Sequence, residues 1–231
     1  TFHGDAAQVL SGSADASLKL WNVADNQEAA NFAGHTGPVV GVAMVGTQAI
    51  SAAADKTVRF WNAANGQAAR TLTESSAAAA LAISPDGSKL AFGLADQSVK
   101  VLQISDGKTL QAIVTGGEVV SVAFSADNSR LVSNNAHRAM VWDVADGRLL
   151  EIVPQEELAT SAFSPLGDAV VLCDAKGTIR VAPMRYTGAV SGMAESISAV
   201  AFHPGGQLIL AGCADGTLRG FNAETFQQTF S

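Results

Sequence analysis

Short apolar runs separated by turn residues recur along the chain, and residues 73–114 show this pattern most clearly. Within them, apolar side chains alternate with small or polar ones rather than recurring at every third or fourth position. Residues 84–87 (Ser-Pro-Asp-Gly) and 105–107 (Ser-Asp-Gly) have the composition of tight turns. Alternation by two between frequent turns is typical of an antiparallel sheet. We therefore predict four strands, at residues 77–83, 89–94, 98–104 and 109–114.

The same pattern occurs six times, with a spacing close to 40 residues. One anchor closes the third strand of each copy, and its members are separated by 40, 41, 40, 40 and 39 residues: Trp21, Trp61, Leu102, Trp142, Ala182 and Phe221. A second anchor closes the first strand and keeps nearly the same spacing: Phe2, Met44, Ile83, Phe124, Phe163 and Phe202. Two anchors that share one period indicate a repeat architecture. The run Ala77–Ala80 alone favours a helix, but its alignment with residues 119–124 and 197–202 predicts a strand.

Four-stranded sheets repeated around an axis bury both of their faces, which is how a β-propeller protects its strand edges. We predict an all-β chain, a β-propeller of about six four-stranded antiparallel blades in a single domain. The repeats are assigned to residues 1–32, 33–72, 73–113, 114–153, 154–193 and 194–231. The first blade lacks most of its innermost strand, of which Thr1 and Phe2 remain. We therefore expect the chain to be part of a longer protein with six or seven blades and flanking domains.

Composition narrows the class of protein further. Hydrophobic residues make up 48% of the chain and charged residues 15%, which fits a well-buried fold and excludes disorder. The net charge of −7, with scattered basic residues, argues against a nucleic-acid surface. The longest apolar run, residues 77–83, is far shorter than the roughly 20 residues of a membrane-spanning helix. Cys173 and Cys213 give no disulfide framework, and no motif for a metal or cofactor is present.

Several short motifs in these repeats resemble the WD-repeat family of β-propellers. The second copy is the most complete, with Gly34-His35, Ser51, Asp55 and Trp61 in register, and the fourth contains the pair Trp142-Asp143. The match extends over essentially the whole chain, whose alanine-rich composition is in keeping with a bacterial source.

In that family, the His, Ser or Thr, Asp and Trp of a complete repeat form a hydrogen-bonded structural tetrad. The resemblance implies such a tetrad for His35, Ser51, Asp55 and Trp61. It also implies structural turn aspartates in three less complete copies: Asp15, Asp96 and Asp215. The fifth copy has Lys176 at the Asp position and Ala182 at the Trp position, so we expect it to be the most loosely packed.

Candidate chemistry is sparse. Ser51, His35 and Asp55 could instead form a hydrolytic triad, but their place in a structural repeat disfavours this interpretation. His3 and His203 fall in equivalent turns between strands, without the Cys or carboxylate neighbours of a metal site. In five copies a Lys or Arg precedes the third-strand anchor by two residues, which predicts a cation–π contact where the anchor is Trp: Lys19, Arg59, Lys100, Arg180 and Arg219.

Function in a repeat scaffold of this kind usually lies in the loops of one face. The only distinctive loop there is in the fourth copy, which is one residue shorter than its counterparts and lacks the turn Asp. Its candidate partner-binding residues are Asn134, Asn135, His137 and Arg138. The alternative interpretation is a turn that has diverged without acquiring a role.

We therefore expect a non-catalytic scaffold that mediates protein–protein interactions within a larger protein or complex. It would need no cofactor, would bind no nucleic acid and would not insert into a membrane. One alternative is an enzyme or sensor propeller that binds a small ligand or metal in its central channel. Another is a propeller that only supports a fused domain.

Overall fold

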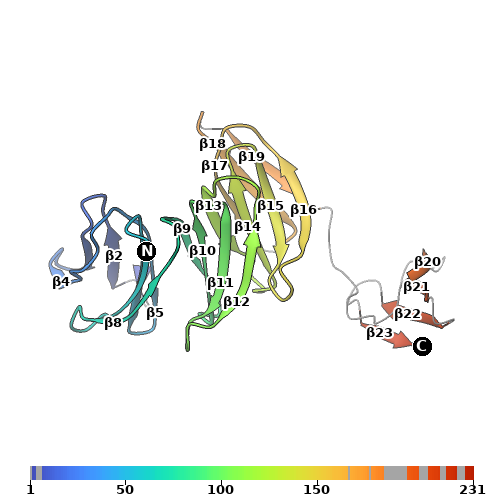
Figure 1. The fold of residues 1–231 in the computed structure, drawn as a ribbon, viewed down its shortest axis with the longest axis horizontal. Coiled ribbons are helices and arrows are strands. Elements are labelled where there is room, and N and C mark those ends of the chain that lie inside the picture. Colours follow the sequence, from blue (N-terminus) through green and yellow to red (C-terminus); the bar gives the residue numbers. More distant parts are fainter. Residues whose placement is uncertain are drawn as a thin grey trace. The chain divides into compact units, whose positions relative to one another are not determined.

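The strands of the chain form six separate antiparallel sheets. The structure, a computed structural model, describes residues 2–3, 7–165, 167–176, 178–184, 197–202, 208–213, 217–222 and 227–231. All regular elements among these residues are strands (Figure 1), so this part of the chain offers no helix of the length and apolarity needed to cross a membrane. The structure divides into two units, Thr1–Met184 and Arg185–Ser231, which are described separately.

The first unit contains five sheets, and in each the strands pair in chain order. Sheet one comprises β1 (Phe2–His3), β2 (Gln8–Gly12), β3 (Leu18–Asn22) and β4 (Glu28–Asn31). Sheet two comprises β5 (Val39–Val45), β6 (Gln48–Ala53), β7 (Thr57–Asn62) and β8 (Ala68–Thr73). Sheet three comprises β9 (Ala78–Ile83), β10 (Lys89–Leu94), β11 (Ser98–Gln103) and β12 (Thr109–Val114). Sheet four comprises β13 (Ser121–Phe124), β14 (Arg130–Asn135), β15 (Arg138–Asp143) and β16 (Leu149–Pro154). The described strands of sheet five are β17 (Leu158–Phe163), β18 (Ala169–Asp174) and β19 (Ile179–Pro183).

The second unit contains the sixth sheet, formed by β20 (Ile197–Phe202), β21 (Leu208–Cys213), β22 (Leu218–Asn222) and β23 (Gln228–Phe230). The prediction of an all-β chain built from six antiparallel blades is confirmed. The innermost strand of the first blade, β1, has only two residues, also as predicted. We number the sheets as blades one to six.

The hydrophobic core lies between successive blades rather than within any one of them. Trp61 of blade two packs in one cluster with Leu10 and Leu20 of blade one. Phe60, on the opposite face of the same strand, packs in another cluster with Phe92 of blade three. Blades three and four share a cluster, as do blades four and five. Because both faces of the inner sheets are covered, their central strands are almost completely buried, which explains why β10 has no polar side chain after its first residue, Lys89.

The first strands of neighbouring blades lie against one another: β5 contacts β9, β9 contacts β13, and β13 contacts β17. The first strand of a blade also contacts the second strand of the blade before it, and small residues on that second strand allow the two strands to approach closely. A Cβ atom added to Gly93 would lie 2.3 Å from Cγ1 of Val119, which lies two residues before the first strand of blade four. A Cβ atom on Gly12 would lie 2.6 Å from Cγ1 of Val39 in blade two. Interiors packed this closely leave no space for an added methyl group.

Substitution of Gly93 tests this contact. We expect Gly93→Ala to destabilise the chain by about 1–3 kcal/mol, because the new methyl group would overlap the Val119 side chain. Urea unfolding followed by circular dichroism measures the loss. The double variant Gly93→Ala/Val119→Ala is the control: it should lose less than the sum of the two single variants, because removing Cγ1 makes room for the methyl group. Additive losses would contradict the proposed steric contact.

Candidate functional site

In blade two, four side chains form a continuous chain of hydrogen bonds. The indole Nε1–H of Trp61 donates to Ser51 Oγ at 2.8 Å. Nε2 of His35 lies 2.7 Å from Ser51 Oγ, and Nδ1 of the same ring lies 2.8 Å from Asp55 Oδ2. These contacts are all satisfied when Ser51 donates to Nε2 and Nδ1–H donates to the carboxylate. The structure thus brings together the four residues that the resemblance to WD repeats singled out.

The Asp55 carboxylate also receives donors from the backbone and from Thr57. The Thr57 hydroxyl donates to Oδ1 at 2.7 Å, the Thr57 N–H donates to the same oxygen at 3.0 Å, and the Thr36 N–H donates to Oδ2 at 3.0 Å. Burial is the largest single effect and would raise the pKa of Asp55, but the hydrogen bonds from Thr57, Thr36 and His35 together lower it to about 2. Asp55 is therefore charged at neutral pH and organises the turn between β6 and β7.

This arrangement differs from a hydrolytic site. A nucleophilic Ser must reach a substrate carbonyl, whereas Ser51 is completely buried and already accepts the Trp61 N–H. The neighbouring indole is also completely buried, so the hydroxyl is shielded from solvent. The geometry is that of a buried polar network, which fixes the register of the strands it joins.

Two of the other predicted turn aspartates occupy the same position in their blades. Asp15 accepts the N–H of Ser17 at 2.8 Å, and Asp96 accepts the N–H of Ser98 at 3.2 Å. The hydroxyl of Ser17 lowers the pKa of Asp15, and the hydroxyl of Ser98 lowers that of Asp96. The residue after each Asp has a positive φ: 71° at Ala16, 67° at Lys56 and 69° at Gln97. Asp215 lies outside the described residues, as does His203, and the side chain of His3 is not described.

The cation–π contacts predicted where the anchor is Trp are confirmed. Lys19 Nζ lies 5.4 Å from the ring centroid of Trp21. The guanidinium carbon of Arg59 lies 5.7 Å from the ring centroid of Trp61. The basic residue therefore covers an aromatic ring at the edge of the core.

Blade three uses an ion pair that the sequence analysis missed. Glu74 lies four residues before β9, as His35 lies four residues before β5. Its carboxylate, which is almost fully buried, pairs with the Lys100 ammonium group. Beside it, the Ser75 hydroxyl donates to Asp96 Oδ2 at 3.0 Å. The spacing of Lys100 within the repeat was noted, but nothing in the sequence pairs it with Glu74.

Blade five supplies its turn acceptor from a position two residues earlier than expected. The sequence alignment placed Lys176 at the Asp position. In the structure, Asp174 Oδ1 accepts the N–H of Lys176 at 2.9 Å and the N–H of Thr178 at 2.8 Å. This turn therefore has a carboxylate acceptor although Lys176 occupies the Asp position, because Asp174 lies at the end of β18 and reaches across the turn.

Two of the four candidate partner-binding residues in blade four are buried within β14. Asn134 is completely buried, and its Oδ1 accepts hydrogen bonds from the hydroxyls of Ser121 and Ser161. Asn135 is 6% exposed, and its Oδ1 accepts the N–H groups of His137 at 3.0 Å and of Arg138 at 3.1 Å. The interpretation of a surface recognition loop was wrong for Asn134, which is completely buried. Asn135 uses its amide oxygen as an acceptor within the shortened turn but also lines the pocket described next.

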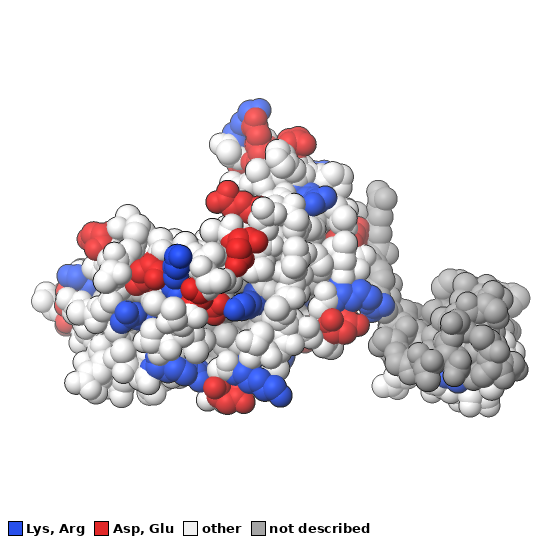
Figure 2. Space-filling view, viewed as in Figure 1, with Lys and Arg blue, Asp and Glu red and all other residues white. Residues whose placement is uncertain are grey.

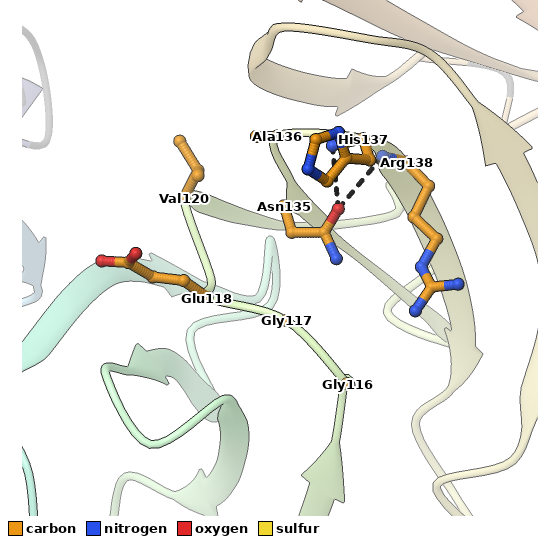
Figure 3. Close-up of a pocket in the computed structure, with 8 residues that line it drawn as sticks. All are labelled: Gly116, Gly117, Glu118, Val120, Asn135, Ala136, His137 and Arg138. Carbon is orange, nitrogen blue, oxygen red and sulfur yellow. Dashed lines mark hydrogen bonds between the residues drawn. The ribbon is translucent and has the colours of Figure 1, made fainter.

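The other two candidates, like Asn135, line a pocket (Figure 3). His137 is exposed, and its Nδ1 lies 2.8 Å from Oε2 of Glu156. Arg138 is partly exposed at the first position of β15. The pocket has a volume of about 510 Å³. We call it the blade-four pocket; its lining residues are Gly116, Gly117, Glu118, Val120, Asn135, Ala136, His137 and Arg138.

Half of this pocket comes from the segment between blades three and four, which the sequence analysis did not consider. The glycine pair at residues 116–117 was the available signal, since copy two has Thr36-Gly37 and copy three has Ser75-Ser76 at these positions. In Figure 3 the carboxylate of Glu118 and the guanidinium of Arg138 lie on opposite sides of Gly117. No group of three or more His, Cys, Asp or Glu residues in the described part of the chain is arranged to hold a metal ion.

The charged state of Asp55 makes the stability of blade two dependent on pH. Because the pKa of Asp55 falls from 3.8 to about 2 on folding, its contribution is complete above about pH 4 and is lost as the pH falls toward 2. Asp55→Asn should lower stability at pH 7 by about 1–3 kcal/mol, because the remaining amide cannot accept all the donors. Urea unfolding from pH 7 to 2 should show the difference between wild type and variant shrinking below pH 4.

Asp15→Asn is the matched control. Asp15 occupies the same turn position in blade one but is exposed, so its substitution should have a much smaller effect at every pH. An equal loss for the two variants would show that the buried network contributes nothing beyond the turn itself.

Comparison with known proteins agrees with the repeated sheets. The WD40 family model, described as "WD domain, G-beta repeat", matches residues 1–22, 26–62 and 185–222. A chain of the structure described as "Crystal Structure of Mitotic Checkpoint Complex" is 21% identical and aligns with a TM-score of 0.70. That alignment covers 77% of this chain and 59% of the other chain. No curated protein is significantly similar to this chain.

The unmatched middle of the chain, from residue 63 to 184, has the same strand order as blade two and supplies the same turn acceptors at Asp96 and Asp174. The solved structure, at its level of identity, shows the fold alone. Three repeats that match the family model over less than half of the chain, together with the buried network of blade two, make the chain similar to WD-repeat β-propellers.

Proposed function

We propose that the chain is a non-catalytic scaffold that binds a protein partner at the face containing the blade-four pocket. The observation that carries this proposal is the pocket itself: about 510 Å³, formed by loops, on a frame of buried strands. Loops held on a rigid frame are the usual place for binding residues. A pocket of this size falls within the range that binds ligands or anchor side chains.

The charges of the pocket support a polar partner. Among the described residues, neither the Glu118 carboxylate nor the Arg138 guanidinium has an ion-pair partner. Val120, which also lines the pocket, is 40% exposed. Apolar area in a pocket that contains unpaired charges of both signs is a combination that peptide segments can complement.

The wider surface supports a protein rather than a nucleic acid as partner. Figure 2 shows basic and acidic side chains interspersed over the face that it displays, without a continuous basic patch. Nucleic-acid binding depends on clustered Lys and Arg that neutralise phosphates, and the chain has 14 basic against 21 acidic residues. The similar solved chain belongs to a structure described as a complex, which fits a role in assembly.

A double variant tests the proposed face. His137→Ala/Arg138→Ala should abolish capture of the partner that co-purifies with the tagged wild-type chain, as quantified by mass spectrometry. The melting temperature should stay nearly unchanged, because His137 is exposed and Arg138 partly so, while the acceptor of their backbone N–H groups, Asn135, is retained.

Lys108→Ala is the control, since Lys108 is an exposed basic residue in the turn between β11 and β12, away from the pocket. It should leave capture unaltered. If both variants lose the partner equally, capture depends on charge without specificity. If the double variant retains the partner, the assignment of this face is contradicted.

A further inference from the structure

Blades two and four differ at the place where the turn carboxylate normally lies. Equivalent positions follow from the strand registers, in which Gly41 pairs with Ala52 and Ser121 pairs with Asn134. Counting from these pairs, Thr36 corresponds to Gly116. In the third strands, Val58 pairs with Ala52 as Ala139 pairs with Asn134. Counting back by one residue, Thr57 corresponds to Arg138.

In blade two, both of these positions donate hydrogen bonds to one carboxylate. The Thr36 N–H lies 3.0 Å from Asp55 Oδ2, and the Thr57 hydroxyl lies 2.7 Å from Asp55 Oδ1. Blade four has a turn one residue shorter, Asn135-Ala136-His137-Arg138, which contains no Asp. The donor positions are therefore retained while the acceptor between them is missing.

The donors left behind in blade four have no partner among the described residues. None of these residues accepts a hydrogen bond from the Gly116 N–H, whose counterpart in blade two donates to Asp55. The same holds for the Arg138 guanidinium and for Nδ2 of Asn135, whose Oδ1 already accepts two turn N–H groups. All three residues line the blade-four pocket.

These donors also lie close together. Nη2 of Arg138 is 3.4 Å from the position that a Cβ atom would take on Gly116, which has a φ of 67°. Nδ2 of Asn135 is 2.4 Å from the corresponding position on Gly117, so a side chain at residue 117 would cover it. In Figure 3 this amide nitrogen points away from the two turn N–H groups and toward Gly117. The two glycines thus keep the donors uncovered.

We propose that the blade-four pocket binds the carboxylate of an Asp or Glu side chain from a partner protein. The guest carboxylate takes the place that Asp55 has in blade two and accepts from the Gly116 N–H, Asn135 Nδ2 and Arg138. The inference rests on the proposed scaffold function and adds the chemistry of the partner. Glu118, on the other side of Gly117, disfavours a second acidic residue, so the pocket selects an isolated acid with neutral or basic neighbours.

Binding of a synthetic peptide to the isotope-labelled full chain tests the proposal. The probe is Ac-Ala-Ser-Asp-Ser-Ala-NH2, and the backbone amide resonance of Gly116 is followed by nuclear magnetic resonance. We expect a saturable shift with the Asp peptide and binding at least about tenfold weaker with the matched Asn peptide, because hydrogen bonds to a charged acceptor are stronger. Equal binding of the two peptides, or saturable binding without a shift at Gly116, would overturn the proposal.

Two further peptides distinguish the source of the anion. A peptide with phosphoserine in place of Asp should bind no more tightly than the Asp peptide, since the space vacated in the turn is that of a carboxylate. Ac-Ala-Ser-Asn-Ser-Ala with a free C-terminal carboxylate should bind as weakly as the amidated Asn peptide. Tighter binding of either peptide would replace the proposed side-chain carboxylate with a phosphate or a chain terminus.

Arg138→Gln should weaken binding of the Asp peptide by about tenfold while Lys108→Ala leaves it unchanged. The comparison of the Asp and Asn peptides uses the wild-type chain and does not depend on how the variant folds. Capture of a protein partner that Arg138→Gln leaves intact would retain the scaffold function and refute the carboxylate site. Peptide binding at Gly116 without any captured protein partner would retain the carboxylate site and refute the scaffold function.

Discussion

Within the first unit, the close approach of the first strand of a blade to the second strand of the blade before it determines the rest of the structure. A sheet buried on both faces obtains almost all of its apolar contacts from its neighbours, so blade spacing decides whether the core clusters form at all. Gly12 and Gly93 set that spacing against Val39 and Val119. At the equivalent position in blade four, Asn134 replaces the small residue and hydrogen-bonds to Ser161 of blade five. The contact between blades is therefore retained while its chemistry changes from apolar to polar.

The complete tetrad is less general than this contact. Only blade two, among the described residues, combines His, Ser, Asp and Trp; in blades one and four the Trp donates to a Ser without a His. All five blades of the first unit have a side-chain acceptor for the N–H groups of the turn between the second and third strands. The position of this acceptor in the turn differs among the blades. The acceptor is Asp15, Asp55, Asp96, Asn135 or Asp174. The reason is physical, since N–H groups in so tight a turn cannot pair with a neighbouring strand.

The features that repeat from blade to blade could be predicted from the sequence. The contacts that replace a missing repeat residue in a single blade could not. Alternation and turn chemistry predicted the sheets, and repetition correctly placed Ala78–Ile83 in a strand despite an alanine run that favours a helix. The ion pair of Glu74 with Lys100 was not predictable, because the two residues are 26 positions apart and only the fold brings them together. Burial of Asn134 and Asn135 was missed for a related reason. Deleting one turn residue changes which atoms face inward, and residue type does not reveal that change.

The sequence analysis singled out the turn that lines one half of the blade-four pocket but missed the other half, Gly116 to Val120, because that half is recognised only by comparison with the complete turn of blade two. An internal repeat supplies its own reference, since blade two shows where the carboxylate and its donors lie when the turn is complete. Losing the Asp alone would have let the turn collapse. Asn135 prevents this by accepting two turn N–H groups, so the remaining donors keep their positions without an internal acceptor. A turn one residue shorter therefore leaves donors facing the pocket, because Asn135 supplies the structural part of the role that Asp55 has in blade two.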